Sequence, residues 1–233
     1  MARLPKGRQT NLTPEAIVDE ALSQFDRGSG EPTIRSLAAG LGAGPSAIYH
    51  HFPSRAAIVQ RAVERVWGEA MENLLELVPR PLEADPREVL VATGLASRRT
   101  WLAHFRLCPY LAASPEGDDF TRDALGAMAV LFERLELEGD QAAAAFYAYG
   151  TFMLGSILFA ATRLIANEQL GEGGAVRIEH TPAMARRSGV TTRRSLDHVI
   201  AVSVTDPAED EELFVGALRG LVEGLGSEGA ARC

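Results

Sequence analysis

Apolar residues recur every three or four positions along most of this 233-residue chain, and that spacing limits the folds open to it. Sustained two-residue alternation, which a half-buried strand would show, is missing throughout. A three-to-four-residue repeat is typical of helices that bury one face. The sequence therefore predicts an all-α protein, and it contains no internal repeat.

The N-terminal quarter contains start and stop signals for three short helices and one long one. Thr13 is a candidate N-cap with Pro14 at the first helical position, and Gly28-Ser29-Gly30 ends that helix. Pro53 breaks the third helix, because proline disfavours helix in the residue before it. We predict helices over residues 13–27, 33–41, 45–51 and 55–77, the last long enough to connect two domains.

The rest of the chain continues in helices with one exception. Asp85 and Glu88 have the form of a capping box for a helix that runs to about Leu107. Further helices are predicted over residues 117–137, 140–168 and 207–225. Residues 171–195 hold four glycines and five arginines with little apolar periodicity, so a long polar loop is expected there. Residues 198–204 fit either a strand or a short helix.

Length and charge indicate two domains of different character. The length exceeds one typical domain, so we expect a flexible basic arm (1–11), a small domain (12–58) and a larger one (59–233). The formal net charge is −8, yet residues 1–67 hold eight Lys and Arg against six Asp and Glu. The acidity therefore belongs to the larger domain, and the small one can face phosphates.

The sequence predicts a cytoplasmic protein with no membrane span. The first ten residues are basic in part but are followed by no apolar stretch, so they resemble neither a signal nor a transit peptide. The longest apolar run, 146–161, is shorter than the roughly 20 residues of a span, which favours a buried helix. Cys108 and Cys233 are the only cysteines and are expected to be reduced.

Two short helices joined by a glycine turn beneath a longer first helix have the form of a helix-turn-helix. The second of these helices would enter the major groove of DNA. A small three-helix cap with no nucleic-acid role has the same pattern. The pattern by itself leaves both interpretations open.

Particular residues in this segment resemble a known signature. Thr33-Ile34-Arg35-Ser36-Leu37-Ala38, Leu41-Gly42 and Ile48-Tyr49-His50-His51-Phe52-Pro53-Ser54-Arg55 are similar to the signature of the tetracycline-repressor (TetR) family, over about residues 12–67. Asp85-Pro86 and the apolar helix near 140–168 also resemble tetracycline-repressor-type C-terminal domains. The resemblance implies a homodimeric repressor that leaves a palindromic double-stranded DNA operator when a small-molecule effector binds.

The predicted DNA contacts lie in and around the second and third helices. Helical geometry lets Tyr49 reach a phosphate while Ile48 and Phe52 face the core, although packing of Tyr49 in the core is the alternative. The resemblance places phosphate contacts at Thr33, Tyr49, His51 and Arg55, base-proximal positions at Gly44, Pro45, Ser46 and His50, and Arg35 where some members touch a base. His51 as a solvated helix end also stays open.

Direct reading of bases is expected to be sparse. Gly44, Pro45 and Ala47 carry no long hydrogen-bonding side chain, so specificity would rest on Arg35, Ser46 and His50, on thymine methyls and on DNA shape. The tail with Arg3, Lys6 and Arg8 can reach along the adjacent groove or merely aid solubility.

The larger domain is predicted to form the dimer and to sense the effector. Helices 140–168 and 207–225 can build a four-helix bundle between subunits, as the family does, or be buried within one subunit. Side chains that can line an apolar pocket with a few polar groups are Trp101, His104, Phe105, Tyr110, Met128, Phe132, Tyr149 and Arg163. A plain core role is the alternative for most of them.

Two other functions are compatible with parts of the sequence. His104 and Cys108 lie four apart and could approach as an imidazole–thiolate pair, but no nucleophile motif or phosphate-binding loop accompanies them, so no enzyme is predicted. Adjacent residues such as His50 and His51 point in different directions on a helix, which argues against a dedicated metal site, and no cofactor is predicted. The second rival is a helical adaptor that no longer binds DNA.

Overall fold

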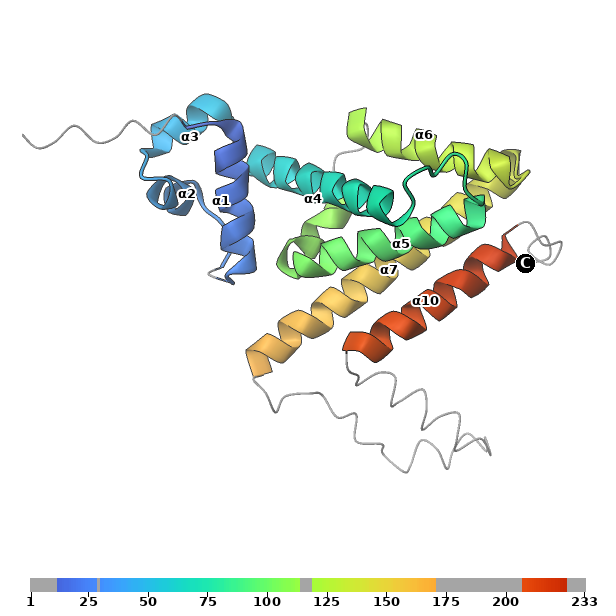
Figure 1. Ribbon diagram of the computed structural model, residues 1–233. Coiled ribbons are helices and arrows are strands. Elements are labelled where there is room, and N and C mark those ends of the chain that lie inside the picture. The colour runs from blue at the N-terminus through green and yellow to red at the C-terminus, as the bar shows by residue number, and fades with distance from the viewer. Residues whose placement is uncertain (1–11, 29, 114–118, 171–206, 226–233) are drawn as a thin grey trace, which may run out of the picture.

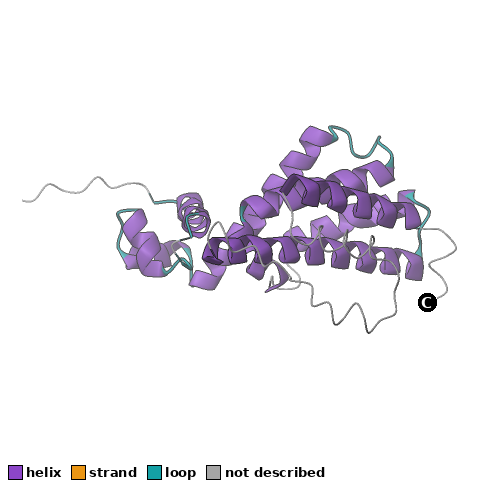
Figure 2. Ribbon diagram, turned by 90° about the horizontal axis from the view of Figure 1, so that it is seen from below, coloured by secondary structure: helices purple, strands orange, loops and turns teal. Residues whose placement is uncertain are grey.

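The computed structural model describes residues 12–28, 30–113, 119–170 and 207–225, and every regular element in them is a helix (Figures 1 and 2). The predicted all-α class is confirmed. The elements are α1 (Pro14–Asp26), α2 (Ile34–Gly40), α3 (Pro45–His51), α4 (Arg55–Leu77), α5 (Pro86–Ala103), the 3-10 helix η1 (Phe105–Ala113), α6 (Asp119–Arg134), α7 (Gly139–Leu170) and α10 (Pro207–Gly224). The arm 1–11, the loop 171–195 and residues 198–204 lie outside the described residues.

Helices α1 to α3 form a small group at one end of the molecule, and α4 leads from this group into a larger bundle of α5, α6, α7 and α10 (Figure 1). Figure 1 shows α7 and α10 running side by side along the outside of the bundle. The long fourth helix therefore joins a small helical domain to a larger one.

Local capping explains why the N-terminal helices begin where they do. The Thr13 side chain accepts a hydrogen bond from the Ala16 N–H at 3.2 Å, and Ser54 accepts one from the Ala57 N–H at 3.2 Å. Thr33 and Ser36 form a capping box in which a serine takes the place of the usual glutamate or glutamine. The positive φ of Gly42, +62°, suits the turn before α3.

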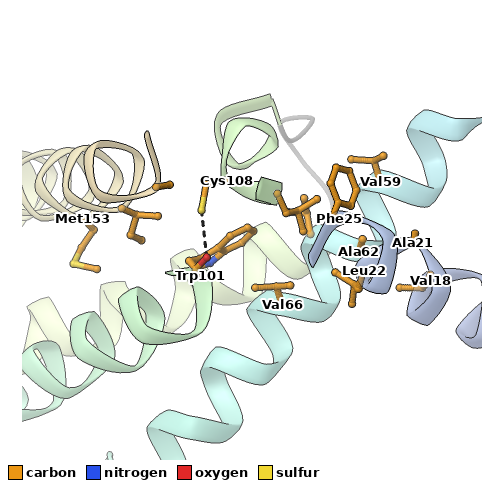
Figure 3. Close-up of a cluster of buried hydrophobic side chains, with 14 of the residues drawn as sticks. Val18, Ala21, Leu22, Phe25, Val59, Ala62, Val66, Trp101, Cys108 and Met153 are labelled. Atoms are coloured by element: carbon orange, nitrogen blue, oxygen red, sulfur yellow. Dashed lines mark hydrogen bonds between the residues drawn. The ribbon is translucent and has the colours of Figure 1, made fainter. Parts of the chain in front are cut away.

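A continuous apolar core runs from the small domain into the larger one (Figure 3). Phe25 of α1 and Val59 of α4 lie in the same cluster as Trp101 of α5 and Cys108 of η1. Deeper in the bundle, a side chain at Gly94 would meet Leu218 of α10 at 2.5 Å, so this glycine lets α5 and α10 approach closely. Shared apolar burial therefore fixes how the two domains sit against each other.

One predicted helix ends earlier than expected. The helix from Asp85 to about Leu107 stops at Ala103, and residues 105–113 form η1 instead. His104 leaves the helical conformation (φ −113°, ψ 39°), and Pro109 cannot donate a backbone hydrogen bond. Asp85 does cap α5, but by accepting from the Arg87 N–H at 2.7 Å rather than through a capping box with Glu88.

Helix α7 is long and apolar enough, over Gly139–Ala166, to span a membrane by length and composition alone. Its Tyr149, Met153 and Ile157 side chains are buried in the core cluster, and other apolar side chains such as Tyr147 and Phe159 are exposed. Helix α7 therefore has one buried face and one exposed face. It is not buried on all sides, as a helix in the centre of a core would be.

Candidate nucleic-acid interface and sensor domain

Helix α3 separates an apolar inner face from a polar outer one. Ile48 and Phe52 are buried, whereas Tyr49 between them is 56% exposed. The alternative that Tyr49 packs in the core is therefore wrong. An exposed phenol on a short helix that follows a tight turn can reach a phosphate oxygen.

The other predicted DNA-contacting residues surround Tyr49 in the fold. Exposed residues come from the start of α2, from the α2–α3 turn and from α3, and they are Thr33, Arg35, Gly44, Pro45, Ser46 and His50. His51 is half-buried, with its ring 5.4 Å from that of His50. The structure brings these residues onto adjoining helix ends, while their contact with DNA stays a prediction.

A hollow of about 500 Å³ lies beside these residues in the small domain. Its walls are Gln24, Arg27, Glu31, Thr33 and Ser36. The lining residues already form hydrogen bonds, since Ser36 donates to Gln24 at 2.6 Å and Arg27 donates to Glu20, outside the lining, at 3.2 Å. None of the predicted effector residues lines this hollow, so it lies in the small domain, apart from those residues.

Arg55 is held between the two domains rather than projecting freely. Its guanidinium donates to the Pro32 carbonyl at 2.7 Å, to Glu31 at 2.8 Å and to the Tyr110 hydroxyl at 3.0 Å. Tyr110 in turn donates to Glu31 at 2.5 Å and packs edge-on against Phe25. Burial, followed by the hydrogen bond to Glu31, raises the pKa of Tyr110. The predicted phosphate contact is thus also a link to η1.

His104 makes a second link between the domains. Its Nδ1 lies 3.0 Å from a carboxylate oxygen of Asp26 in α1, and its Nε2 lies 3.3 Å from Glu69 in α4. Two residues along, Arg106 donates to the Asp26 carbonyl at 2.6 Å and also bonds Glu168 of α7. The early end of α5 therefore directs three nearby polar side chains, His104, Arg106 and Tyr110, toward the small domain.

The imidazole–thiolate pair considered from the sequence does not form. The Cys108 thiol is fully buried and donates to the Trp101 carbonyl at 3.3 Å, as Figure 3 shows, while His104 faces carboxylates instead. Burial raises the pKa of Cys108 to about 12, so the thiol is not activated as a nucleophile. The four-residue spacing misled because residues 104–108 are not on an α-helix.

The predicted effector-pocket residues occupy four different places. Trp101 and Phe132 are buried, with Trp101 packed edge-on against Trp67 of α4 at 5.3 Å between ring centroids. Tyr149 is buried and donates to the Leu90 carbonyl at 2.8 Å, and burial raises its pKa. Phe105 and Met128 pack partly buried at the core edge. His104 and Tyr110 face the small domain, and Arg163 faces α10.

Several polar residues that sequence reasoning missed complete these arrangements. Arg98 of α5 is only 5% exposed and bonds Asp210 of α10, to which Arg163 of α7 also donates. Arg98 stands at helical spacing from Gly94 and Trp101, so a charge in a core register was the available signal. Among the described residues, no three His, Cys, Asp or Glu side chains are placed to hold a metal ion.

An exposed helix-turn-helix, joined by one long helix to a helical bundle, defines the class of two-domain helical DNA-binding regulators. Residues 17–62 match the family model described as bacterial regulatory proteins, tetR family. That match is confined to the N-terminal domain, which is therefore similar to the tetR family. No curated protein sequence matches the chain.

Solved structures share the fold over nearly the whole chain. The TetR family protein ActR of Streptomyces coelicolor in complex with (S)-DNPA is 23% identical, with a TM-score of 0.65, over 91% of this chain and 98% of that one. A possible TetR family transcriptional regulator from S. coelicolor A3(2) is 20% identical, with a TM-score of 0.69, over 94% and 100%. TetR from Acinetobacter baumannii AYE is 18% identical, with a TM-score of 0.64, over 91% and 96%.

Proposed function

We propose that this protein is a cytoplasmic, homodimeric transcription repressor that binds a palindromic operator through α3 and is released by a small-molecule effector. The observation that carries the proposal is the outward Tyr49, with its exposed neighbours, on a domain that matches the tetR family model. Residues 12–58 would bind DNA and residues 59–233 would form the dimer and the sensor. The proposal gives the chain no catalytic role.

The operator test compares Tyr49→Ala with Arg80→Ala. Tyr49 is the proposed phosphate contact, whereas Arg80 is an exposed arginine in the α4–α5 connection, paired with Glu83 at 3.2 Å. Loss of one hydrogen bond to a charged phosphate should weaken operator binding roughly 10- to 100-fold. Binding is measured by fluorescence anisotropy on fragments of the genome, beginning with the upstream region of the protein's own gene, at two salt concentrations.

Each outcome of that comparison has a clear meaning. Selective, salt-sensitive binding that Tyr49→Ala weakens and Arg80→Ala retains supports the proposed interface. Equal binding by both variants would remove Tyr49 from the interface. If wild-type protein binds no fragment even at low salt, the adaptor interpretation takes the place of the repressor.

The outward faces of α7 and α10 support the dimer. Tyr147 is 75% exposed on α7, and Phe159 lies exposed three turns further along. On α10, Leu213 is exposed, and Gly216 and Gly220 have open space where a side chain would stand. Large apolar groups beside open glycines suit close helix packing, and two such pairs related by two-fold symmetry would form a four-helix bundle.

The dimer test places a charge on this face and, as a control, elsewhere. Gly220→Arg should convert the dimer to a monomer in analytical ultracentrifugation, because a long cation would fill the space left for the partner helix. Leu75→Glu alters an exposed apolar residue of α4 outside the proposed contact and should leave the mass unchanged. A monomeric wild-type protein, or a dimer that survives Gly220→Arg, would reject the proposed face.

Effector response would pass through the links between the domains. ActR is described in complexes with (S)-DNPA and with actinorhodin, which supports a ligand-responsive role for a chain of the same fold. In this chain, Arg55 is bonded to Tyr110 and Glu31 in the place where the resemblance puts a phosphate contact. A phosphate and the Tyr110 hydroxyl would therefore compete for one guanidinium, so a shift of η1 would change DNA affinity.

Tyr110→Phe tests this coupling. The variant keeps the ring contact with Phe25 but removes the hydroxyl that holds Arg55. Operator affinity should rise severalfold, because Arg55 is freed for phosphate. Unchanged affinity would show that Arg55 does not exchange between the two partners.

A further inference from the structure

Two arginines from different helices converge on one carboxylate inside the larger domain. Arg98 of α5 and Arg163 of α7 each donate to a different oxygen of Asp210, which lies in the first turn of α10. Burial would raise the pKa of Asp210, but the hydrogen bonds from the two guanidinium groups outweigh it and hold that pKa below its usual value. Asp210 is therefore bound as a carboxylate.

The positive charge and hydrogen-bonding capacity of this cluster exceed what Asp210 supplies. The neighbouring Arg99 pairs with Glu211 at 2.5 Å, so three guanidinium groups face two carboxylates. Within the described part of the chain, the buried Nε of Arg98 has no hydrogen-bond partner. A buried guanidinium donates well to two oxygens of a bidentate acceptor, and here one donor is left over.

Aromatic rings flank both arginines. The Arg98 guanidinium lies 4.7 Å from the ring centroid of Phe214, which stacks on Phe152 at 5.7 Å, and the Arg163 guanidinium lies 4.9 Å from that of Phe159. Planar apolar surfaces next to a cationic site suit a ligand that joins a ring to a carboxylate.

We propose that Arg98 and Arg163 form a carboxylate-binding site, filled by Asp210 in this structure, that takes the carboxylate of a small aromatic acid as the effector. The inference rests on the proposed function, because it names the class of effector that would release the operator. Asp210 holds the place of the ligand's carboxylate, so binding replaces one anion by another and leaves no guanidinium unpaired.

Displacement of Asp210 has a consequence for the dimer. Asp210 and Glu211 hold the first turn of α10 against α5 and α7, while Leu213 and Gly216, in the next two turns, belong to the proposed dimer face. Release of the first turn would shift that face and, through it, the spacing of the two DNA-binding domains. Such coupling needs only that the effector binds the displaced state better than the operator-bound state.

The experiment removes the Asp210 carboxylate from the site and then measures binding of a free carboxylate. Asp210→Ala removes the internal anion, and Glu209→Ala is the control, because it removes an exposed carboxylate from the same turn. Benzoate is compared with benzamide, which has the same ring without the charge. At about five times its Kd, benzoate should raise the Tm of Asp210→Ala by roughly 2–4 °C, and benzamide should not. A further Arg163→Met substitution should abolish the rise.

The possible results distinguish failure of the carboxylate site from failure of the proposed repressor function. The site is rejected if benzoate stabilises Asp210→Ala and Glu209→Ala equally, or if the rise survives Arg163→Met, with helix content checked by circular dichroism. Benzoate should also weaken operator binding by wild-type protein severalfold. If Asp210→Ala binds benzoate but wild-type operator affinity is unchanged, the ion pair is structural and the effector role is rejected. If wild-type protein does not bind operator in the absence of benzoate, the proposed repressor function is rejected, but the carboxylate site is not.

Discussion

The two domains differ in how many polar side chains they bury. In the small domain, Arg35, Ser46, Tyr49 and His50 are exposed around an apolar interior. In the larger domain, α5 alone buries Ser97, Arg98 and Thr100, and Tyr149 of α7 is buried beside it. The small domain buries one polar side chain, Gln24, which accepts a hydrogen bond from Ser36 at 2.6 Å. A buried polar group is stable only with its partner in place, so the interior of the larger domain depends on more such pairings than that of the small domain.

That difference suits the two roles proposed for the domains, DNA binding and effector sensing. Exposed polar groups on a capped, apolar-cored unit change little when the rest of the molecule moves, which suits a surface that must match DNA. Buried pairs that join α5, α7 and α10 are sensitive to one competing ligand, because loss of a single partner leaves the other unpaired. Four measurements test this contrast between the domains.

The largest effect is expected where the domains share one core. Trp101→Ala should lower the free energy of unfolding by about 3–5 kcal/mol, because Trp101 is fully buried and packs on Trp67 of α4. Leu82→Ala, at a residue 71% exposed, should change it by less than about 0.5 kcal/mol. Both are measured by urea denaturation, and a loss below about 1 kcal/mol for Trp101→Ala would mean that the domains pack independently.

The thiol of η1 probes the same boundary without perturbing it. In a Cys233→Ser background, Cys108 should react with Ellman's reagent at pH 8 roughly 1000-fold more slowly than an ordinary thiol, because burial raises its pKa from 9.0 to about 12. Urea should restore the normal rate. Rapid labelling of the folded protein would show that the boundary between the domains opens readily.

The Asp210 carboxylate tests whether buried pairing stabilises the larger domain. Its pKa is lower in the folded than in the unfolded state, so its stabilisation is present above its unfolded value near 3.8 and is lost as the pH falls through the folded value. Asp210→Asn should therefore be less stable than wild type by about 1–3 kcal/mol at pH 7. The gap should close as the pH falls below 3.8 in urea titrations. A gap that persists in acid would assign the loss to packing rather than charge.

The smallest effect compares two tyrosines directly. Tyr149→Phe should cost about 1 kcal/mol, because it leaves the buried Leu90 carbonyl without its hydrogen bond. Tyr49→Phe, at an exposed hydroxyl of the small domain, should leave the free energy of unfolding unchanged. Equal effects in urea unfolding would contradict the proposed contrast between the domains.

Local sequence signals, which act over a few residues, determined where the helices of the small domain begin and end. Thr13, Pro14 and Pro53 set helix ends through local capping or the loss of a backbone donor, so the bounds of α1, α3 and α4 agree with the sequence prediction to within a residue. The inward Ile48 and outward Tyr49 likewise follow from helical geometry alone. The DNA-contact predictions depend on these local features, which is why sequence reasoning could assemble that surface.

Only the tertiary structure decided the polar contacts between distant segments. Arg55 meets Tyr110 across 55 positions, and Arg98 meets Asp210 across 112, so neither pairing can be derived from helical spacing. The early end of α5 turns His104 and Tyr110 toward the small domain rather than into a common pocket. Helix propensity and capping act over a few residues, whereas the partner of a buried charge depends on which helices pack together, and that is determined by the core as a whole.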